Sequence, residues 1–168
     1  MHTSQQVAAH INMLTQKSQA LQAPAQSITI VNGPLIVIGQ GPYPQIIAGF
    51  TDWVSTGTTA LAQMQNMAEV PKGTESDAIF DAFRSHVRVQ QMLLNILIGK
   101  VGLFEQVPFI GQPVAAVLRQ VESVTDTLSY KLIDSIPSRA EDFKSQAESL
   151  HGTLTLCIDK HQNLGGMS

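Results

Sequence analysis

Charged and aromatic side chains are scarce in this chain of 168 residues, at 14% and 5% of the composition. The few Lys and Arg residues are scattered along the chain, and the formal net charge is −3. The chain therefore lacks the basic patch that a nucleic-acid backbone or an anionic membrane surface requires. We expect no nucleic-acid partner.

Cysteine is almost absent. Cys157 is the single cysteine, so it cannot form a disulfide within the chain. It is either a small buried apolar side chain or a bridge to a second copy of the chain. Cysteine usage therefore does not identify the redox compartment.

Long hydrophobic runs are also missing. The N-terminal stretch MHTSQQ has no apolar core of a secretory signal, so we expect no signal peptide in the sequence as given. The longest nearly apolar run, residues 28–38, is interrupted by Asn32, Gly33 and Pro34. It is shorter than the ~20 residues that cross a bilayer, and we expect no transmembrane segment.

The motifs of common catalytic sites do not occur. There is no Gly-x-Ser-x-Gly, no Gly-rich phosphate loop and no His-x-x-x-His pair. His10, His86, His151 and His161 lie on three different predicted helices without carboxylates at metal-ligand spacing, and we expect each to be partly exposed. The sequence thus predicts no enzyme, no metal site and no cofactor.

What the chain has in abundance is aliphatic and small polar residues typical of amphipathic helices. Hydrophobic residues make up 43%, enough for one core, so we expect one domain over residues 1–168 with disordered tails at 1–4 and 163–168. Apolar positions recur at helical spacing in five segments. The pattern predicts an all-α fold, a five-helix bundle with stripes at residues 7–21, 46–64, 79–98, 114–132 and 143–157.

Polar and proline residues mark the helix ends. The stretch from Thr74 to Asp77 opens the third helix with oxygen acceptors for its free N–H groups, and Ser138 with Glu141 forms a Ser-x-x-Glu capping box for the fifth. Pro113 suits the first turn of the fourth helix.

The segment at residues 28–44 contains an Asn-Gly step between apolar runs, which is a hairpin signal. Pro34 follows that step and has no N–H for the turn. We expect instead that the first helix bends at Pro24, continues through Ile28 and Val31, and ends at Asn32 and Gly33 in a left-handed conformation.

Residues 35–38 are four consecutive aliphatic side chains, so they have no polar side at either helix or strand spacing. We expect them to contact apolar groups on more than one face. Two interpretations are open: they cap the bundle core, or they form a flap over an apolar cavity.

Two stretches resemble a known family: QKSQALQAPAQSITIVNG at residues 16–33 and IGKVGLFEQVPFIGQPVAAVLRQVESVTDTL at residues 98–128. With Lys100, Phe104, Pro108 and Gly111 joining the third and fourth helices, the chain resembles the fungal cell-wall galactomannoprotein family, also called the hydrophobic surface-binding protein A family. The chain departs from that family's pattern at residues 34–44 and lacks a Ser/Thr-rich stalk and an Asn-x-Ser/Thr sequon.

The resemblance implies an all-α domain without catalytic activity, secreted or associated with the cell wall. Some members enclose a long-chain fatty acid of C16 to C20, such as palmitic or arachidonic acid, in an internal apolar cavity. Burying such a tail gains about 0.8 kcal/mol per methylene, which exceeds the association cost of at least ~4 kcal/mol. The carboxylate head needs hydrogen-bond donors, because an unpartnered charge is costly to bury.

Candidate head-group residues are hydroxyls and amides on or beside the apolar stripes. We expect Ser129 and Ser149 to bind the carboxylate, with Gln90 and Tyr130 as further candidates; each hydroxyl is alternatively satisfied by its own helix. The tail-lining candidates are alternatively plain core. They are Leu14, Phe50, Val54, Leu61, Phe83, Leu94, Leu118, Val121, Leu128, Phe143 and Leu150.

The predicted function is non-catalytic sequestration or transport of a long-chain fatty acid between the helices. The alternative is adsorption to hydrophobic surfaces, as an adhesive or an enzyme-recruiting protein. A third hypothesis is self-association through residues 35–38 or through Cys157.

Overall fold

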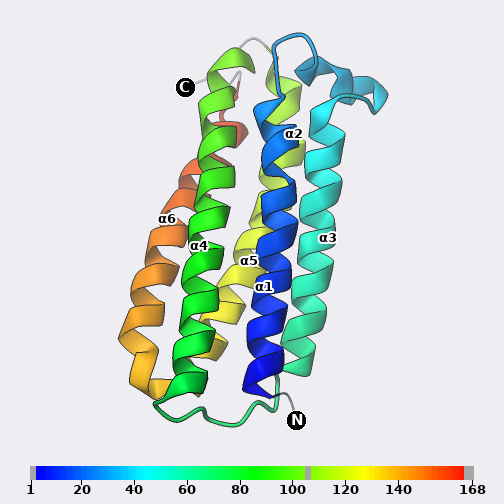
Figure 1. The fold of residues 1–168 in the computed structure, drawn as a ribbon. Coiled ribbons are helices and arrows are strands. Elements are labelled where there is room, and N and C mark those ends of the chain that lie inside the picture. Colours follow the sequence, from blue (N-terminus) through cyan, green and yellow to red (C-terminus); the bar gives the residue numbers. More distant parts are fainter. Residues whose placement is uncertain (1–2, 105–106, 165–168) are drawn as a thin grey trace.

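The computed structural model describes residues 3–104 and 107–164, and every regular element among them is a helix (Figure 1). The predicted all-α fold is therefore confirmed. Within these residues the α-helices number six, not five, and four short 3-10 helices join them. The bounds are α1 (Ser4–Ala20), α2 (Gln22–Gln26), η1 (Gly33–Ile38), α3 (Pro42–Gln63), α4 (Thr74–Val101), η2 (Gly102–Phe104), η3 (Pro108–Ile110), α5 (Gly111–Ser135), η4 (Pro137–Arg139) and α6 (Ala140–Gln162).

The additional helix results from Pro24. A proline ring clashes with the carbonyl four residues earlier and has no N–H to bond it. That carbonyl belongs to Ala20, which is the last residue of α1, and Leu21 separates α1 from α2. Pro24 thus divides the expected first helix instead of bending it.

The expected continuation of this helix through Ile28 and Val31 is wrong. α2 ends at Gln26, and Asn32 has a φ of −87°, outside the left-handed region. The Asn32 side chain organises the turn instead: its Oδ1 accepts the N–H of Thr29 at 2.6 Å, and its Nδ2 donates to the carbonyl of Ser27 at 2.7 Å. These local bonds offer the backbone an alternative to the helix.

Residues 35–38 lie in η1, which projects beside the bundle end at the top of Figure 1. Val37 is 70% and Ile38 66% exposed, while Ile36 alone packs against the core. The expectation that all four side chains contact apolar groups on several faces is therefore wrong. Successive side chains of a 3-10 helix point in different directions. When such a helix packs on the end of the bundle, only one of these four side chains faces the core.

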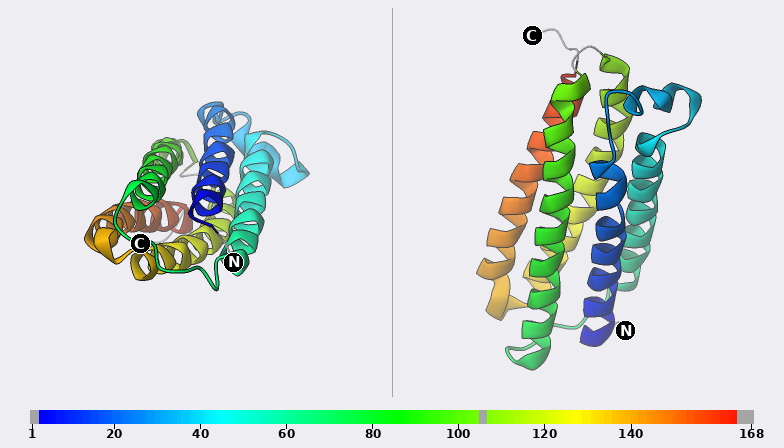
Figure 2. Two further views of the ribbon diagram at one scale, coloured as in Figure 1. Left: turned by 60° about the horizontal axis from the view of Figure 1, so that its bottom comes forward. Right: turned by 45° about the horizontal axis from the view of Figure 1, so that its top comes forward.

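The five long helices form a closed ring, seen end-on in Figure 2. Each packs on two neighbours, in the order α1, α4, α6, α5, α3 and back to α1. α1, α4 and α6 run in one direction, and α3 and α5 in the other. With neighbouring axes 8–10 Å apart, the centre of a five-membered ring lies about 8 Å from each helix axis, against about 6 Å in a four-membered ring.

Large aromatic side chains fill this wide interior. Phe143 on α6 meets Phe80 and Phe83 on α4 edge-to-face, with ring centroids 5.4 and 5.5 Å apart. Such geometries add about 0.5–1.5 kcal/mol per pair beyond the area buried. The fully buried aromatic residues are Trp53, Tyr43, Phe50, Phe83, Phe104 and Phe143.

Several expectations about chain and helix ends need correction. Thr3 and Gln6 form a capping box at α1, and Leu164 beyond α6 is buried, so the predicted tails are too long by these residues. Residues 1–2 and 165–168 lie outside the described part. The expected capping box of Ser138 and Glu141 is wrong, because Pro137 begins η4 and α6 starts at Ala140 without a side-chain cap.

Among the residues that the structure describes, one segment, Thr74–Phe104, is long and apolar enough to cross a membrane by length and composition, with a mean hydropathy of 1.2. In this structure it packs between α1 and α6, with 39% of the apolar window buried inside the bundle. A core helix of a bundle passes the same test, so the segment is weak evidence for a membrane span.

Gly57 sets the approach of α3 to α5, and its replacement tests the packing. A Cβ at this position would lie 2.7 Å from a methyl of Val124, whereas at Gly99 on α4 it would meet nothing within 4 Å. We expect Gly57→Ala to lower the free energy of unfolding by about 1–3 kcal/mol through overpacking. Gly99→Ala is the matched control and should raise it by up to about 1 kcal/mol. Urea unfolding of both variants checks this, and equal effects would contradict the close packing of α3 on α5.

Candidate ligand-binding site

The residues predicted to contact a lipid tail line the interior of the ring. They come from all five long helices and belong to one continuous apolar cluster or pack against it. Val54 and Leu61 are half-buried; the other nine are at most 3% exposed. The grooves that Ser129 and Leu61 border are open to the surface, so an internal cavity remains a prediction. The nine buried residues are Leu14, Phe50, Phe83, Leu94, Leu118, Val121, Leu128, Phe143 and Leu150.

A set of polar side chains crosses this apolar interior near the middle of the bundle. We call Ser18, Trp53, His86, Gln90 and Thr125 the polar layer, and none of them is more than 2% exposed. The rings of Trp53 on α3 and His86 on α4 stack with centroids 5.8 Å apart. Gln90 follows His86 by four residues and so lies on the same face of α4. The layer therefore joins at least α3 and α4 inside the ring.

Contacts of neighbouring residues place α1 at the same level. Thr15 Oγ1 lies 3.2 Å from His86 Nδ1, and Ser18 lies three residues further on α1, on the same face as Thr15.

The fourth helix of the layer is α5. Val124, which precedes Thr125, approaches Gly57, and Gly57 lies one helical turn from Trp53. Four helices thus contribute to the polar layer.

Most of the buried side-chain polar atoms without a hydrogen-bond partner in the described residues belong to the polar layer; Tyr43 Oη and His161 Nε2 lie outside it. The five residues carry seven side-chain polar atoms. One of them, His86 Nδ1, contacts Thr15, and the other six have no hydrogen-bond partner within residues 3–104 and 107–164. A buried polar atom left without a partner costs about 1–3 kcal/mol. The atoms are Ser18 Oγ, Trp53 Nε1, His86 Nε2, Gln90 Oε1, Gln90 Nε2 and Thr125 Oγ1.

The two hydroxyls of the layer differ from others in the bundle. A helical Ser or Thr usually bonds the carbonyl four residues earlier when no other acceptor is near. Ser18 and Thr125 do not, so their hydroxyls are left for a different partner. The hydroxyls that do make this bond are those of Thr15, Thr51, Thr59, Thr127, Ser129 and Thr153.

His86 and His161 are buried, at 1% and 0% exposure, so the expectation of partly exposed histidines is wrong for both. Burial lowers the pKa of His86 to about 4, and the ring is therefore neutral at pH 7. Burial also lowers the pKa of His161, opposed by its bond to the Cys157 carbonyl. The spacing that reveals His86 is present in the sequence, because it lies three residues after Phe83 and four before Gln90 on the apolar stripe.

The sequence also leaves Cys157 open between burial and a bridge to a second chain. Its side chain is fully buried, and burial raises the pKa of the thiol to about 12. A buried neutral thiol cannot reach a second chain, so self-association through Cys157 is ruled out in this fold.

Ser129 and Ser149, the expected head-group pair, make hydrogen bonds to different partners. Ser129 is 5% exposed and donates to the carbonyl of Thr125 at 2.8 Å, which is the alternative use of a helical hydroxyl. Ser149 is exposed and accepts the side-chain N–H of Gln91 on α4 at 2.9 Å. Of the further candidates, Tyr130 is 76% exposed and only Gln90 lies in the interior.

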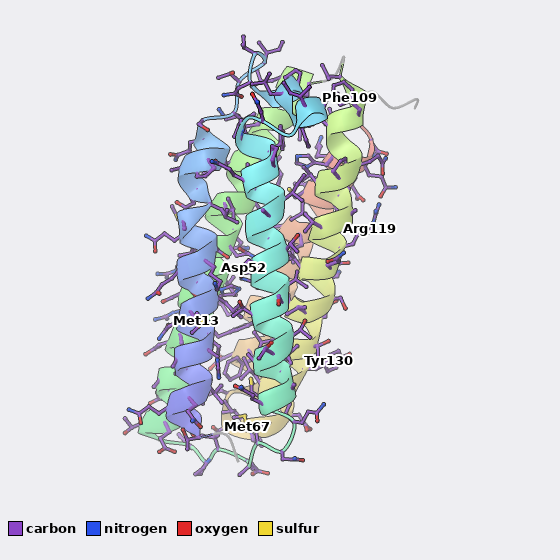
Figure 3. All side chains as sticks on the ribbon, turned by 90° about the vertical axis from the view of Figure 1, so that its right-hand side faces the viewer. Met13, Asp52, Met67, Phe109, Arg119 and Tyr130 are labelled. Atoms are coloured by element: carbon purple, nitrogen blue, oxygen red, sulfur yellow. The ribbon has the colours of Figure 1, made fainter. Side chains whose placement is uncertain are left out.

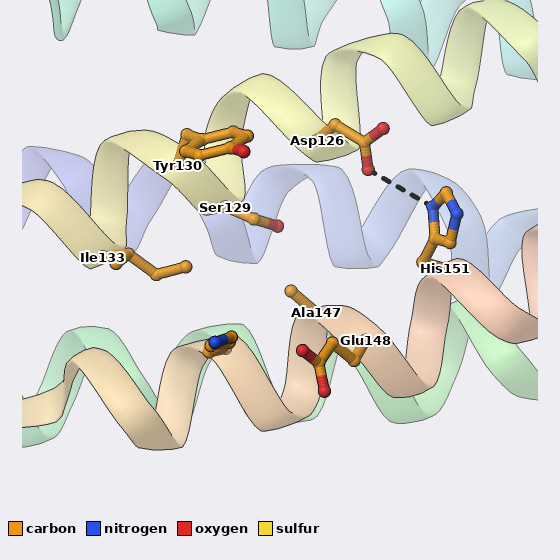
Figure 4. A pocket seen from close by; sticks show the side chains of 8 residues that line it. Asp126, Ser129, Tyr130, Ile133, Ala147, Glu148 and His151 are labelled. Atoms are coloured by element: carbon orange, nitrogen blue, oxygen red, sulfur yellow. Dashed lines mark ion pairs between the residues drawn. The ribbon is translucent and has the colours of Figure 1, made fainter.

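A groove of about 500 Å³ lies between α5 and α6 (Figure 4). Ser129, Ile133 and Ala147 form its less polar part, and Figure 4 shows Tyr130 on the same helix as Ser129. At one end His151 Nδ1 lies 3.6 Å from Asp126 and 3.7 Å from Glu122. Lys144 and Glu148 add charged side chains to the rim of this groove.

A second groove, of about 620 Å³, lies on the other side of α5 against α3. Tyr130 lines both grooves, and in Figure 3 its side chain points outward from α5. Leu61 is the one tail candidate here. Within the described ranges, no group of three or more His, Cys, Asp or Glu residues could hold a metal ion.

Comparison with known proteins shows which fold this is. No family model and no curated protein matches the chain. Among solved structures, AFMP4P in complex with palmitic acid superposes with a TM-score of 0.82 at 14% identity, over 95% of this chain and 99% of that one. The chain has the same fold.

Two domains of the MP1 protein of Penicillium marneffei also share this fold. Ligand binding domain 2, complexed with multiple arachidonic acids, gives a TM-score of 0.73 at 17% identity over 94% of this chain and 92% of that one. Ligand binding domain 1, complexed with arachidonic acids, gives 0.73 at 17% identity over 94% and 95%. At these identities the likeness concerns the fold, and it agrees with the architecture that the family resemblance implies.

Histidine burial offers a test of the polar layer that needs no ligand. His86 has a folded-state pKa of about 4, below its ordinary value of 6.5, so the unfolded chain binds the proton more tightly. Stability is therefore complete above pH 6.5 and falls as the pH drops toward 4, by about 2 kcal/mol between pH 7 and 5. Urea unfolding at both pH values should show this loss, and His86→Gln should reduce it while His161 still titrates. An identical pH dependence in the variant would show that His86 is not buried in a neutral form.

Proposed function

We propose that this domain binds a long-chain fatty acid of C16 to C20 between its helices, without catalysis, and sequesters or carries it. One observation supports this most: an apolar interior lined by five long helices, in a fold that AFMP4P shares in its complex with palmitic acid. The MP1 domains, complexed with arachidonic acids, support the same ligand class.

The free energy for binding comes from the tail. Each methylene moved from water to the interior gains about 0.8 kcal/mol, so a C16 tail gains roughly 11–12 kcal/mol. Loss of translational and rotational freedom costs at least ~4 kcal/mol. The difference corresponds to about micromolar affinity.

The same side chains fill the core and would line the tail, so binding requires them to separate. The interior side chains hold the helices together by apolar packing, while polar contacts such as Lys17 with Asp52 and Gln91 with Ser149 join neighbouring helices at the surface. An interior held by apolar packing can adapt its shape, because its contacts are non-directional. A bound fatty acid then replaces core contacts that the helices lose.

Trp53 makes the location of the ligand measurable. It is the single tryptophan and is fully buried in the interior. We expect bromine-substituted palmitic acid to quench most of its fluorescence at saturation, and native mass spectrometry to show one or more fatty acids retained by the folded protein. Quenching by bromine requires near contact, which a ligand held at the surface does not make.

Matched controls distinguish the interior from the grooves. Ala147→Phe fills the α5–α6 groove and Ala62→Phe the α3–α5 groove, and both should leave quenching and retention unchanged. Retention without quenching, lost in either variant, would move the ligand to that groove. A protein that stays lipid-free after incubation with palmitic and arachidonic acids would overturn the proposed function.

A second candidate function, adsorption to hydrophobic surfaces, has its own support in η1 and the turn before it. No Asp, Glu, Lys, Arg or His occurs between Lys17 and Asp52, and this stretch carries several exposed aliphatic side chains. We call them the apolar tip. They are Ile30 (61% exposed), Val31 (78%), Leu35 (36%), Val37 (70%) and Ile38 (66%).

The apolar tip is tested by charging it. Val37→Asp combined with Ile38→Lys keeps the net charge and should reduce adsorption to alkyl-coated beads at least about tenfold, because two exposed apolar side chains are lost. Met92→Asp combined with Leu156→Lys is the matched control, since these residues are 55% and 47% exposed on the sides of the bundle. Equal adsorption by both variants would contradict a role of the tip. A concentration-dependent dimer, broken by the first pair alone, would indicate self-association through residues 35–38 instead.

We also propose that the chain belongs with the galactomannoprotein family and acts outside the cell or at the cell wall. The stretches at residues 16–33 and 98–128 and the shared fold support this. Fractionation of the producing cells, with detection of the protein in medium, wall and cytoplasm, tests the location.

A further inference from the structure

The polar layer lies in the interior, where the proposed lipid would be held. The donors and acceptors among its unpartnered atoms indicate which polar group would fit there. We propose that the polar layer binds the polar group of the internal lipid in an uncharged, hydrogen-donating form, as an alcohol or an undissociated carboxylic acid. This inference rests on the proposed function, because it concerns a ligand held inside the ring.

The position of the layer is consistent with a ligand held in the interior. His86 and Gln90 lie near the middle of α4, Trp53 near the middle of α3 and Thr125 near the middle of α5. Apolar residues continue the interior toward both ends of the bundle. A lipid whose polar group reaches the layer therefore keeps its chain in apolar surroundings.

We assign the ring proton of His86 to Nδ1 from the contacts of Thr15. Thr15 Oγ1 donates to the carbonyl of Ile11 at 3.0 Å, so its single proton is in use. Its contact of 3.2 Å with His86 Nδ1 is then a bond donated by the ring N–H. In a neutral imidazole the other nitrogen, Nε2, carries no proton and is an acceptor. His86 therefore presents a buried acceptor without a donor.

The rest of the layer contributes both kinds of group. Trp53 Nε1 is a donor, Gln90 supplies a donor and an acceptor, and the hydroxyls of Ser18 and Thr125 can do either. An alcohol or a carboxylic acid matches such a set, since each has a proton to give to His86 Nε2 or Gln90 Oε1 and an oxygen to accept from Trp53 or the Gln90 amide. A carboxylate has acceptors and no donor. Its oxygens would therefore repel the two acceptors of the layer, His86 Nε2 and Gln90 Oε1, and leave them without a hydrogen bond.

Charge leads to the same conclusion. A buried carboxylate needs a Lys or Arg as its counter-ion. The buried residues in the described part of the chain include no Lys and no Arg. Lys17, the neighbour of Ser18, is turned to the surface, where it pairs with Asp52 at 2.6 Å. Asp126, the neighbour of Thr125, lies beside His151 in the outer groove. An ionised head group in the layer would be buried without compensation, which costs several kcal/mol.

Three ligands with the same sixteen-carbon chain separate the possibilities: hexadecanol, palmitic acid and hexadecane sulfonate, which stays ionised. We expect the wild-type protein to bind hexadecanol at least about tenfold more tightly than the sulfonate, measured by displacement of a fluorescent fatty acid. Gln90→Leu should reduce this preference to within about threefold, because it removes a donor and an acceptor of the layer.

The variant is expected to fold, since replacing an unsatisfied buried amide by an apolar group of similar size is neutral or stabilising. Its melting temperature should be equal to or above that of the wild type. Gln91→Leu is the matched control: the Gln91 amide bonds Ser149 and Thr153 between α4 and α6, outside the layer, so the preference for the alcohol should persist.

The outcomes distinguish this inference from the proposed function. Equal binding of all three ligands, tighter binding of the sulfonate, or an unchanged preference in Gln90→Leu overturns the assignment of the layer while fatty-acid binding stands. Failure of the wild type to bind any of the three overturns the proposed function itself.

Discussion

Closure of five helices into one ring is the constraint on which the rest of the structure depends. A ring of five has its centre about 8 Å from each helix axis, too far for small aliphatic side chains alone to fill. The chain has few aromatic residues, and six of its nine are fully buried in this interior. The outer faces of the helices are polar and require no aromatic side chains. Aromatic residues are therefore few, and most of them lie in the core.

Ring closure also determines which residues can act together. Ser129 and Ser149 both lie beside apolar stripes, on helices that are neighbours in the ring. α6 packs between α4 and α5, however, so its successive residues face different partners: Ala147 lines the α5 groove, and Ser149 bonds Gln91 on α4. Periodicity places a residue on a helix face, but the order of helices in the ring decides which neighbour that face meets. That order depends on long-range packing and has no local signal in the sequence.

Local patterns predict what depends on local physics. The apolar stripes identify the five long helices, and the residues on them form the core, because a helix must bury its apolar face. The failures occur where a side chain competes with the helical backbone. Pro24 ends α1 because it has no N–H to bond the carbonyl of Ala20. Asn32 stabilises a loop at the place where the sequence predicts a helix that ends at Gly33. The exposure expected for His86 is wrong for another reason: its residue type favours exposure, whereas its position on the apolar stripe with Phe83 and Gln90 favours burial, and the position decides.

The polar layer connects stability to function through its energetic cost. A buried polar atom without a partner costs about 1–3 kcal/mol, which is large beside the marginal stability of a folded domain. Apolar packing around Trp53 and Phe143 has to offset that cost in the free protein. A molecule that satisfies the layer recovers part of it, and this gain adds to the transfer of the tail from water. If the domain binds a lipid as proposed, the ligand stabilises the folded chain by more than tail burial alone, and the preference among lipids depends on the head group even though the tail supplies most of the free energy.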